Sequence, residues 1–298
     1  MPDLPLDLVT FGEAMVEFDG RAPGIWHQGV GGDTLNVAVA ARRAGARVGF
    51  ASALGVDIWG DAILDVCAAE TIGTSAVLRD ARRHTGLYFV SHDRKGHHFT
   101  YQRSGSAASA HIPGPELGTV LSGCKCLHIS GISLAVSPPE NGLLDRILAA
   151  TSSSGAKLSF DPNYRNRLWP AEKARGPILA AMKVATILLP GMEDMRNLFG
   201  LGSVEDALAF CSSLGPEILV LKDGRNDIHV LDTASHVVVT PPRVDAKDAN
   251  GAGDCFDGVF LAAVLAGKSS AHAAWEATRE AAKSTLRSGA LGDRVTTI

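Results

Sequence analysis

The chain reads D-A-N-G-A-G-D-C-F-D-G-V-F from Asp248 to Phe260. Small residues let a backbone turn sharply and leave its N–H groups uncovered. The run Gly251-Ala252-Gly253 is followed by an apolar-periodic helix pattern that continues to about Ala266. Uncovered N–H groups at a helix N-terminus attract a phosphate or a developing negative charge. The stretch therefore predicts an anion hole made by the amides of Gly251, Ala252 and Gly253.

Asp254 follows this run directly, although a carboxylate repels phosphate. Its predicted role is therefore to take the proton from a hydroxyl group that attacks the phosphoryl group. The alternative is that Asp254 only caps the helix, because Asp is common at helix N-termini.

The composition excludes several classes of partner. The chain has 298 residues, which fits one large or two small domains, and 46% of them are hydrophobic. The formal net charge is −4 and there is no basic run, which argues against a nucleic-acid partner. The N-terminal stretch has acidic residues and no basic region, so it does not resemble a signal peptide. Since no apolar run approaches the roughly 20 residues that span a bilayer, we expect no membrane segment.

The cysteines indicate a reducing compartment. They are odd in number and lie on strand or helix patterns: Cys67, Cys124, Cys126, Cys211 and Cys255. The spacing of Cys124 and Cys126 is too tight for a C-x-x-C metal site. We therefore expect buried free thiols and a cytoplasmic protein.

Two segments alternate apolar and polar residues, which is typical of half-exposed strands. The first covers residues 15–30, and the second covers 83–101 with a hairpin turn at Arg94-Lys95-Gly96. We expect the two to pair in one small sheet, a lid formed by about 14–31 and 83–104 and inserted in a larger domain.

The rest of the chain alternates short apolar strands with helices, which predicts a parallel sheet covered on both faces. The predicted strands of this sheet are 6–12, 47–54, 127–130, 157–161, 185–189 and 218–222, with a hairpin of 228–232 and 236–240 at one edge. The predicted helices are 31–44, 58–72, 138–151, 171–182, 192–199, 204–214, 255–266 and 271–288. We expect residues 1–298 to form a single domain with its ligands at the carboxyl ends of the strands.

The pattern D-x-x-G-A-G-D-x-F-x-G-x-F resembles the C-terminal signature of the ribokinase-type (PfkB) carbohydrate kinases. The resemblance implies an α/β fold of the ribokinase-like type, with three α/β/α layers and a mostly parallel central sheet. It also implies that Asp254 is the catalytic base, that Gly251, Ala252 and Gly253 form the anion hole, and that the enzyme uses ATP and Mg²⁺. Ser288-Gly289-Ala290 resembles the segment that borders the nucleotide and monovalent-cation sites, and Asp248 is the expected ligand of a cation such as K⁺.

Three further constellations predict a sugar site. Two glycines and an amide, Gly31-Gly32 and Asn36, suit close contact with a sugar, or else form a helix start capped by Asp33 or Thr34. An arginine provides a planar fork of donors that suits a carboxylate. We therefore expect three residues of the predicted lid and its exit to face one pocket: Tyr88, Tyr101 and Arg103. The alternative is that the tyrosines only pack the lid sheet and that the arginine pairs with a surface acid. Arg165 follows a predicted strand and is either a ligand contact or a plain surface residue.

The motifs D-x-N-Y-R-x-x-L-W and Y-x-R-x-G-S-A-x-S-A are similar to those of the 2-keto-3-deoxygluconate kinases within this family. The resemblance implies that the sugar acid is held by Gly32, Asn36, Tyr88, Tyr101, Arg103 and Arg165. The nucleotide is expected to contact Asn163, Lys222, Gly224, Asp227, Gly251, Gly253 and Ala290. Relatives of this kind also use their lids in oligomers, so we expect a homo-oligomer, a dimer through the lid.

Four positions depart from the family pattern, the first being Asn250, where the family usually has a small or hydroxyl residue. The strand-1 turn reads Gly12-Glu13 where the family has an aspartate that meets sugar hydroxyls. The N-x-x-E element that organises Mg²⁺ reads Gly191-Met192-Glu193-Asp194, so Asp194 is the expected carboxylate and acts through water. Asp227 stands where the nucleotide loop usually ends in glycine.

The predicted reaction is ATP-dependent phosphorylation of a primary hydroxyl of a keto-deoxy sugar acid. The alternatives within the family are a fructokinase and a 2-keto-3-deoxygalactonate kinase. A binding or regulatory protein that lost turnover is a further alternative. A nicotinamide-dependent dehydrogenase would need a glycine-rich turn after the first strand, and Phe11-Gly12-Glu13 does not provide one.

Overall fold

The computed structural model describes residues 5–22, 24–93, 96–137 and 139–291. Within them a nine-stranded sheet has the order β13-β12-β11-β10-β9-β8-β1-β4-β5. Every neighbouring pair in this sheet is parallel except β11–β12 and β12–β13, which form the predicted antiparallel edge. The bounds of its strands are β1 (Leu8–Phe11), β4 (Val48–Gly55), β5 (Gly73–Asp80), β8 (Cys126–Ser130), β9 (Lys157–Asp161), β10 (Ile187–Leu188), β11 (Ile218–Leu221), β12 (Ile228–Asp232) and β13 (His236–Val239).

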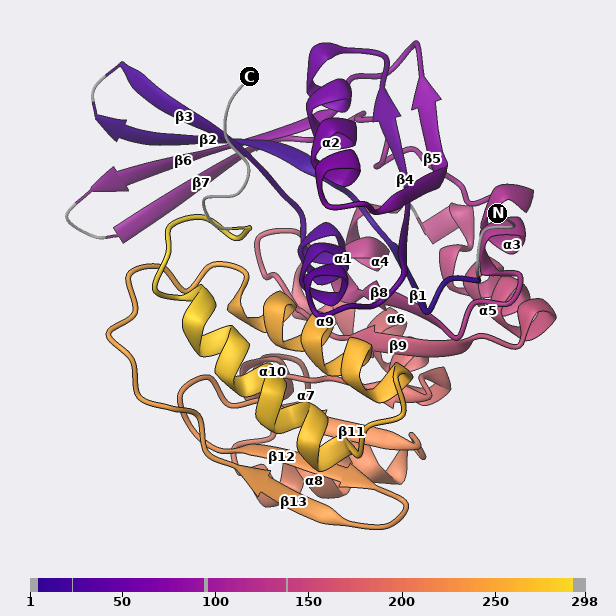
Figure 1. Cartoon of the computed structure of the whole chain (residues 1–298), viewed down its shortest axis with the longest axis vertical. Helices are drawn as coiled ribbons and strands as arrows, with labels where there is room; N and C mark the ends of the chain where they lie inside the picture. The colour runs from indigo at the N-terminus through magenta and orange to yellow at the C-terminus, as the bar shows by residue number, and fades with distance from the viewer. Residues whose placement is uncertain (1–4, 23, 94–95, 138, 292–298) are drawn as a thin grey trace.

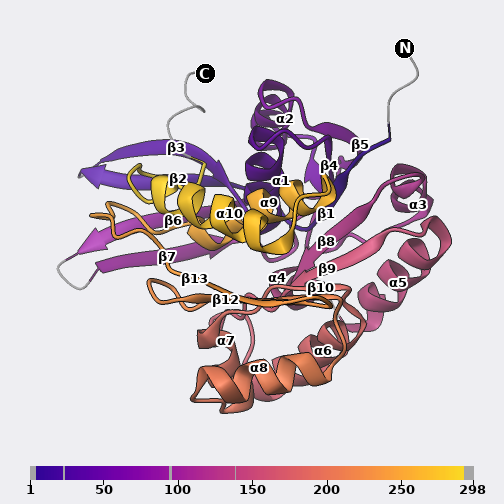
Figure 2. The ribbon, with the colours of Figure 1, turned by 60° about the horizontal axis from the view of Figure 1, so that its bottom comes forward.

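Helices cover both faces of this sheet, as Figure 2 shows. One layer consists of α1 (Asp33–Arg43), α2 (Ile58–Ala69), α9 (Ala252–Leu265) and α10 (Ser270–Ser284). The other consists of α3 (Pro115–Leu121), α5 (Leu143–Ser154), α6 (Ala171–Val184), α7 (Met192–Phe199) and α8 (Val204–Ser213), with the short α4 (Gly131–Val136) and the 3₁₀ turn η1 (Pro139–Asn141) at its end. Adjacent residues of β1 show the two cores: Leu8 packs with the first layer and Val9 with the second. The three predicted layers are confirmed.

A separate four-stranded sheet projects from the core on one side (Figure 1). Its order is β3-β2-β6-β7, and its strands are β2 (Met15–Ala22), β3 (Ile25–Gly31), β6 (Gly86–Asp93) and β7 (Gly96–Gln102). The two predicted segments do pair, through a parallel contact of β2 with β6. Residues 94 and 95 of the predicted hairpin turn lie outside the described residues.

Several predictions of elements were wrong. β5, α3 and α4 were not predicted, and β5 gives a weak signal because only Ala76 of this edge strand is fully buried. The predicted helix 138–151 begins only at Leu143, since Gly142 before it has left-handed backbone. Thr71 has a positive φ of 57°, and α2 ends at Ala69 instead of residue 72.

The contact of α1 with α9 places the two N-terminal turns of the site beside each other. Gly258 makes this approach possible, because a Cβ there would lie 2.4 Å from the carbonyl oxygen of Val37 and 2.7 Å from the Cβ of Ala40. Protein interiors are close-packed, so an added methyl group at such a point forces the helices apart.

Gly258→Ala is therefore expected to lower the free energy of unfolding by about 1–3 kcal/mol, measured by urea denaturation. The matched control is Gly118→Ala in α3, where an added Cβ has no atom within 4 Å. Removal of a helical glycine there is expected to stabilise the protein by roughly 0.5–1 kcal/mol. Equal effects of the two substitutions would contradict the close approach of α1 and α9.

The five cysteines are free thiols, four of them buried and Cys255 half-buried. No helix among the described residues is long and apolar enough to cross a bilayer.

Candidate active site

The predicted anion hole lies at the start of α9, which begins at Ala252 and so includes two of the three small residues. Gly251 is the N-cap with φ of 73°, and a Cβ there would lie 2.8 Å from that of Ala290. Both the left-handed backbone and this close approach require glycine. The N–H of Ala252 donates to the carbonyl of Ala249 at 3.2 Å. Within the described part of the chain, the N–H groups of Gly251, Gly253 and Asp254 make no such bond, so they are the donors available to an anion.

Asp254 sits in the first turn of α9 and is held by α1. Its Oδ2 accepts a hydrogen bond from Asn36 Nδ2 at 2.8 Å, and its side chain does not cap the helix. Burial raises the pKa of Asp254 to about 7, and the nearby Asp33 carboxylate adds to this, while Asn36 and the Arg165 cation oppose it. A carboxyl with a pKa near neutrality is suited to accept a proton in catalysis.

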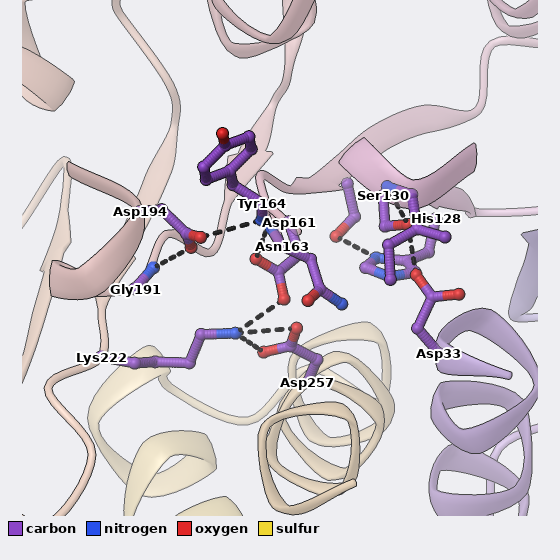
Figure 3. A network of polar contacts seen from close by, with 12 residues as sticks. Asp33, His128, Ser130, Asp161, Asn163, Tyr164, Gly191, Asp194, Lys222 and Asp257 are labelled. Atoms are coloured by element: carbon purple, nitrogen blue, oxygen red, sulfur yellow. Dashed lines mark hydrogen bonds and ion pairs between the residues drawn. The ribbon is translucent and has the colours of Figure 1, made fainter. Parts of the chain in front are cut away.

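Asn36 and Asp33 lie one turn apart at the start of α1 and face the same site. Asn36 is 7% exposed, and its buried Oδ1 has no hydrogen-bond partner among the described residues. Asp33 accepts a hydrogen bond from Ser130 Oγ (Figure 3), and burial raises the pKa of its carboxyl. The N-cap of α1 is Gly32, with no side-chain cap, so neither Asp33 nor Thr34 has the predicted capping role. Asp33 was not predicted to belong to the site, although an acid directly after two glycines at a helix start was the available signal.

Gly32 is required by the packing of the β1–β2 link. Its φ is 140°, and a Cβ there would lie 2.4 Å from the carbonyl oxygen of Glu13. The glycine that was predicted to contact the sugar therefore also brings the start of α1 against this link.

Arg103 does not point a free guanidinium at the site. Its Nε donates to Glu13 Oε2 at 2.8 Å, and its Nη2 donates to the same oxygen. Glu13 is 4% exposed, and its Oε1 accepts from Ser106 Oγ at 2.8 Å. The alternative that Arg103 pairs with a surface acid is wrong in one respect, because the acid is buried. Glu13 lies between β1 and β2, where the chain enters the small sheet, and its partners Arg103 and Ser106 follow β7, where the chain leaves that sheet. The Glu13 carboxylate therefore connects these two segments.

Glu13→Gln is expected to lower the free energy of unfolding by about 3 kcal/mol, because it leaves a largely buried guanidinium without its counter-charge. The control is Glu217→Gln, which removes the exposed ion pair with Lys157 and should change stability by less than about 1 kcal/mol. Urea denaturation of both variants is the measurement. Similar losses in the two would show that the Glu13–Arg103 pair is not a structural tie.

The two predicted tyrosines lie beside Arg103, on neighbouring strands of the small sheet. Their ring centroids are 5.9 Å apart, and the Arg103 guanidinium lies 5.6 Å from the ring centre of Tyr101. Tyr88 is buried and donates its hydroxyl to Glu17 at 2.5 Å, while Tyr101 is 41% exposed. Burial, with the Glu17 charge, raises the pKa of Tyr88 well above its usual value. Tyr101 is therefore the more accessible of the two tyrosines.

Arg165 is the cation of the site without a counter-ion. It follows β9 in the turn 161–165, which is fixed by a bond from the Asn163 N–H to Asp161 at 3.0 Å and one from the Tyr164 N–H to Asp194 at 2.8 Å. The exposed Arg165 side chain makes no hydrogen bond or ion pair with any described residue. Its charge nevertheless lowers the pKa values of both Asp254 and Asp33. Arg165 is therefore near enough to the two buried acids to affect their charge, although its own side chain is exposed.

Lys222 lies at the end of β11 and forms a buried ion-pair cluster (Figure 3). Its Nζ lies 3.1 Å from Asp161 Oδ2 and 2.7 and 2.9 Å from the two oxygens of Asp257. The ammonium group is therefore engaged by two acids, and the predicted nucleotide contact is not part of this arrangement. Asp257 was not predicted to belong to the site, although an acid in the apolar pattern of α9 was the available signal.

The other predicted nucleotide and cation residues act as ties between loops. Asp227 accepts from Thr240 Oγ1 at 2.6 Å, next to Gly224 in the β11–β12 turn. Asp248 accepts from the N–H groups of Asn250 and Gly289, both at 2.9 Å, and so holds the segment of Ala290 against Gly251.

Asp194 has both carboxylate oxygens engaged by backbone, from the N–H of Gly191 at 3.1 Å and that of Tyr164 at 2.8 Å. Burial and the Asp161 charge raise its pKa to about 6. No cluster of three or more metal-binding side chains occurs in the described ranges. Mg²⁺ on a nucleotide needs only one or two carboxylates besides phosphates and water, so this donor set fits such an ion and not an ion held by protein alone.

Comparison with known proteins identifies the family. The sequence pattern of the pfkB family carbohydrate kinases matches residues 6–297. The chain belongs to this family. It is therefore a carbohydrate kinase, and the alternating strands and helices are those of the ribokinase-like fold.

The relatives include more than one substrate class. The chain is 31% identical over 281 residues to a 2-dehydro-3-deoxygluconokinase of Escherichia coli, covering 90% of this chain and 91% of that protein. It is 29% identical to probable fructokinase-4 of Arabidopsis thaliana, with 87% and 82% covered.

Solved structures of this family share the fold. The PfkB protein from Polaromonas sp. JS666 matches with a TM-score of 0.86 and 32% identity, over 94% of this chain and 96% of that one. A putative Ribokinase II of Escherichia coli, solved in complex with ATP and Mg²⁺, matches with a TM-score of 0.84 and 23% identity, over 97% and 95%.

Proposed function

We propose that this kinase transfers the γ-phosphoryl group of ATP to a primary hydroxyl of a keto-deoxy sugar acid similar to 2-keto-3-deoxygluconate. The observation that carries the proposal is the pairing of a catalytic carboxyl, Asp254, with an unpaired cation, Arg165, across one site. A neutral sugar offers such a cation no charge, whereas a substrate carboxylate does.

Asp254 takes the proton of the attacking hydroxyl, and Asn36 holds its other side in place. The N–H groups of Gly253 and Asp254 donate to the oxygens of the phosphoryl group, where negative charge gathers during transfer. Arg165 holds the acid end of the sugar. Gly32, Asn36 and Tyr101 contact its hydroxyl groups, with Tyr88 and Arg103 forming the wall behind them.

The nucleotide lies along Asn163, Gly224, Asp227 and Ala290. Mg²⁺, held through water by Asp194, would neutralise charge on the nucleotide phosphates, and a monovalent cation such as K⁺ would lie at the Asp248 loop. Lys222 supports this region from below and does not contact the phosphates.

The small sheet acts as a lid on a single domain of residues 1–298. Its face with Tyr88 and Tyr101 closes over the sugar and excludes water, which would otherwise accept the phosphoryl group. Ile25 and Trp26 are exposed on β3, at 56% and 48%, and we infer that two lids pack together through such apolar residues in a dimer. The free thiols favour a cytoplasmic location.

The lid contact predicts that Trp26→Ser converts a dimer into a monomer, measured by light scattering on a sizing column. Trp275→Ser is the control, since Trp275 is equally exposed but lies on α10, away from the lid. A wild-type protein that is already a monomer, or a Trp26→Ser protein that stays a dimer, would contradict the lid contact.

A substrate panel tests the function. ADP release is measured with 2-keto-3-deoxygluconate, 2-keto-3-deoxygalactonate and fructose at equal concentrations. We expect kcat/KM for one of the two sugar acids to exceed that for fructose by about 10- to 100-fold, because one charge-assisted hydrogen-bonded contact to a carboxylate is worth about 1.5–3 kcal/mol.

Fructokinase activity is the second candidate, because Glu13 neutralises Arg103 and so leaves one free cation where a sugar-acid site was expected to have two. A preference for fructose would establish it and overturn the sugar-acid proposal.

A further inference from the structure

Three charged side chains meet beneath the anion hole, each from a different element. Asp161 ends β9, Lys222 follows β11, and Asp257 lies in α9. The Asp257 side chain is 1% exposed, that of Asp161 8% and that of Lys222 14%. The ammonium group is thus enclosed between one acid from the sheet and one from the helix that begins at the anion hole.

Lys222 is fixed at both ends. Its N–H donates to the carbonyl of Pro190 at 2.9 Å, and its carbonyl accepts from the N–H of Met192 at 2.8 Å, so its backbone is part of the sheet edge. At the other end its Nζ contacts Asp161 and Asp257. The Lys222 side chain therefore connects the carboxyl end of β11 in the central sheet to α9, and we call this connection the strut.

The strut reaches α9 three residues after the catalytic base. Residues three apart in a helix lie on the same side, one turn from each other. Asp254 and Asp257 therefore move together, and the position of Asp257 sets that of the first turn, with its free N–H groups. α9 is also held by α1, which packs against Gly258, the residue after Asp257.

Stability alone does not explain a cluster of this kind. Replacement of a buried ion pair by apolar residues of similar volume is often neutral or stabilising, because the charges lose their hydration. Burial raises the pKa of the Asp257 carboxyl, whereas Lys222 holds the pKa of Asp161 below its usual value against the effect of burial. Lys222 therefore stabilises the charge of Asp161 inside the protein.

We propose that Lys222 is a positioning residue, which acts through Asp257 to fix the first turn of α9, and with it Asp254, relative to the carboxyl ends of the strands. In this proposal Lys222 makes no contact with the nucleotide. This inference rests on the kinase activity and deepens the proposed function, but it does not depend on which sugar is the substrate.

The test compares Lys222→Met, Asp257→Leu and the double variant with Lys157→Met, which removes an exposed ion pair at the far end of β9. Steady-state kinetics use the best sugar of the panel, and calorimetry gives the Kd for ATP. We expect kcat to fall by 10- to 100-fold in each single variant, with KM and Kd for ATP within twofold of the wild type. The double variant should be no worse than the poorer single one, because both changes remove the same strut. Lys157→Met should behave as the wild type.

Two results would overturn the proposal: a tenfold or larger loss of ATP affinity in Lys222→Met, or losses in kcat that multiply in the double variant. If a single variant does not fold, Lys222→Arg, which keeps a cation beside Asp161 and Asp257, supplies the comparison of ATP affinity. A panel on which the wild type phosphorylates no sugar contradicts the proposed function, and the Kd for ATP in the variants still decides between a strut and a nucleotide ligand.

Discussion

Asp254→Asn is expected to lower kcat by a factor of about 10³, because the variant cannot take the proton of the attacking hydroxyl. Asn has the same size and can still pair with Asn36, which contacts Asp254 at 2.8 Å in the native protein. Binding of the sugar and of ATP should therefore persist, with Kd values from calorimetry within about threefold of the wild type. Turnover is measured as ADP release.

The matched control is Asp245→Asn, at an exposed acid in the loop before α9. It should leave kcat unchanged. If Asp254→Asn kept more than about a hundredth of the wild-type kcat, the loss would be smaller than the roughly 10²-fold minimum expected from removal of a general base, and Asp254 would not be the base.

The raised pKa of Asp254 adds a pH test of the same variant. With a pKa of about 7, the wild-type kcat/KM should fall on the acid side with a midpoint near pH 7, as the base becomes protonated. The native carboxyl binds a proton more tightly than the unfolded one, whose pKa is 3.8. This group therefore reduces stability as the pH rises from about 4 to 7. Asp254→Asn removes that loss, so its Tm should exceed that of the wild type at pH 8 and approach it near pH 4. An equal Tm difference at both pH values would contradict the raised pKa.

Arg165→Ala is expected to raise KM for the sugar acid by about 10- to 100-fold, while KM for ATP changes by less than about threefold. The size follows from the loss of a charge-assisted hydrogen-bonded pair, worth about 1.5–3 kcal/mol. Arg165→Lys should recover part of the effect, because it keeps the charge but not the planar fork of donors.

Arg167→Ala is the control, an exposed arginine two residues further along the same loop. Its KM values should match those of the wild type. A larger rise of KM for ATP than for the sugar acid in Arg165→Ala would place this cation on the phosphates instead of the substrate carboxylate. The same measurement with fructose should show little change, since a neutral sugar does not use the charge.

Elements whose environment follows from their own residues were predicted well. β9 and α7 have the predicted bounds, because a strand buried on both faces is continuously apolar and a helix over a core repeats every 3.6 residues. β5 was not predicted, because an edge strand buries few residues and so has a weak apolar pattern. The start of α9 was placed three residues late, since the small residues of the anion hole carry no apolar pattern although they are helical.

Residues 248–260 were enough to identify the family and to propose the anion hole and the base, because a backbone turn and a helix start depend on neighbours in the chain. The ion-pair partner of each charged side chain was known only from the folded structure. Arg103 was predicted to face the substrate and meets Glu13 instead, 90 residues away, and Lys222 meets Asp257, 35 residues away. These partners depend on which strand ends and helix turns are brought together by the order of the sheet, and no spacing along the chain contains that order.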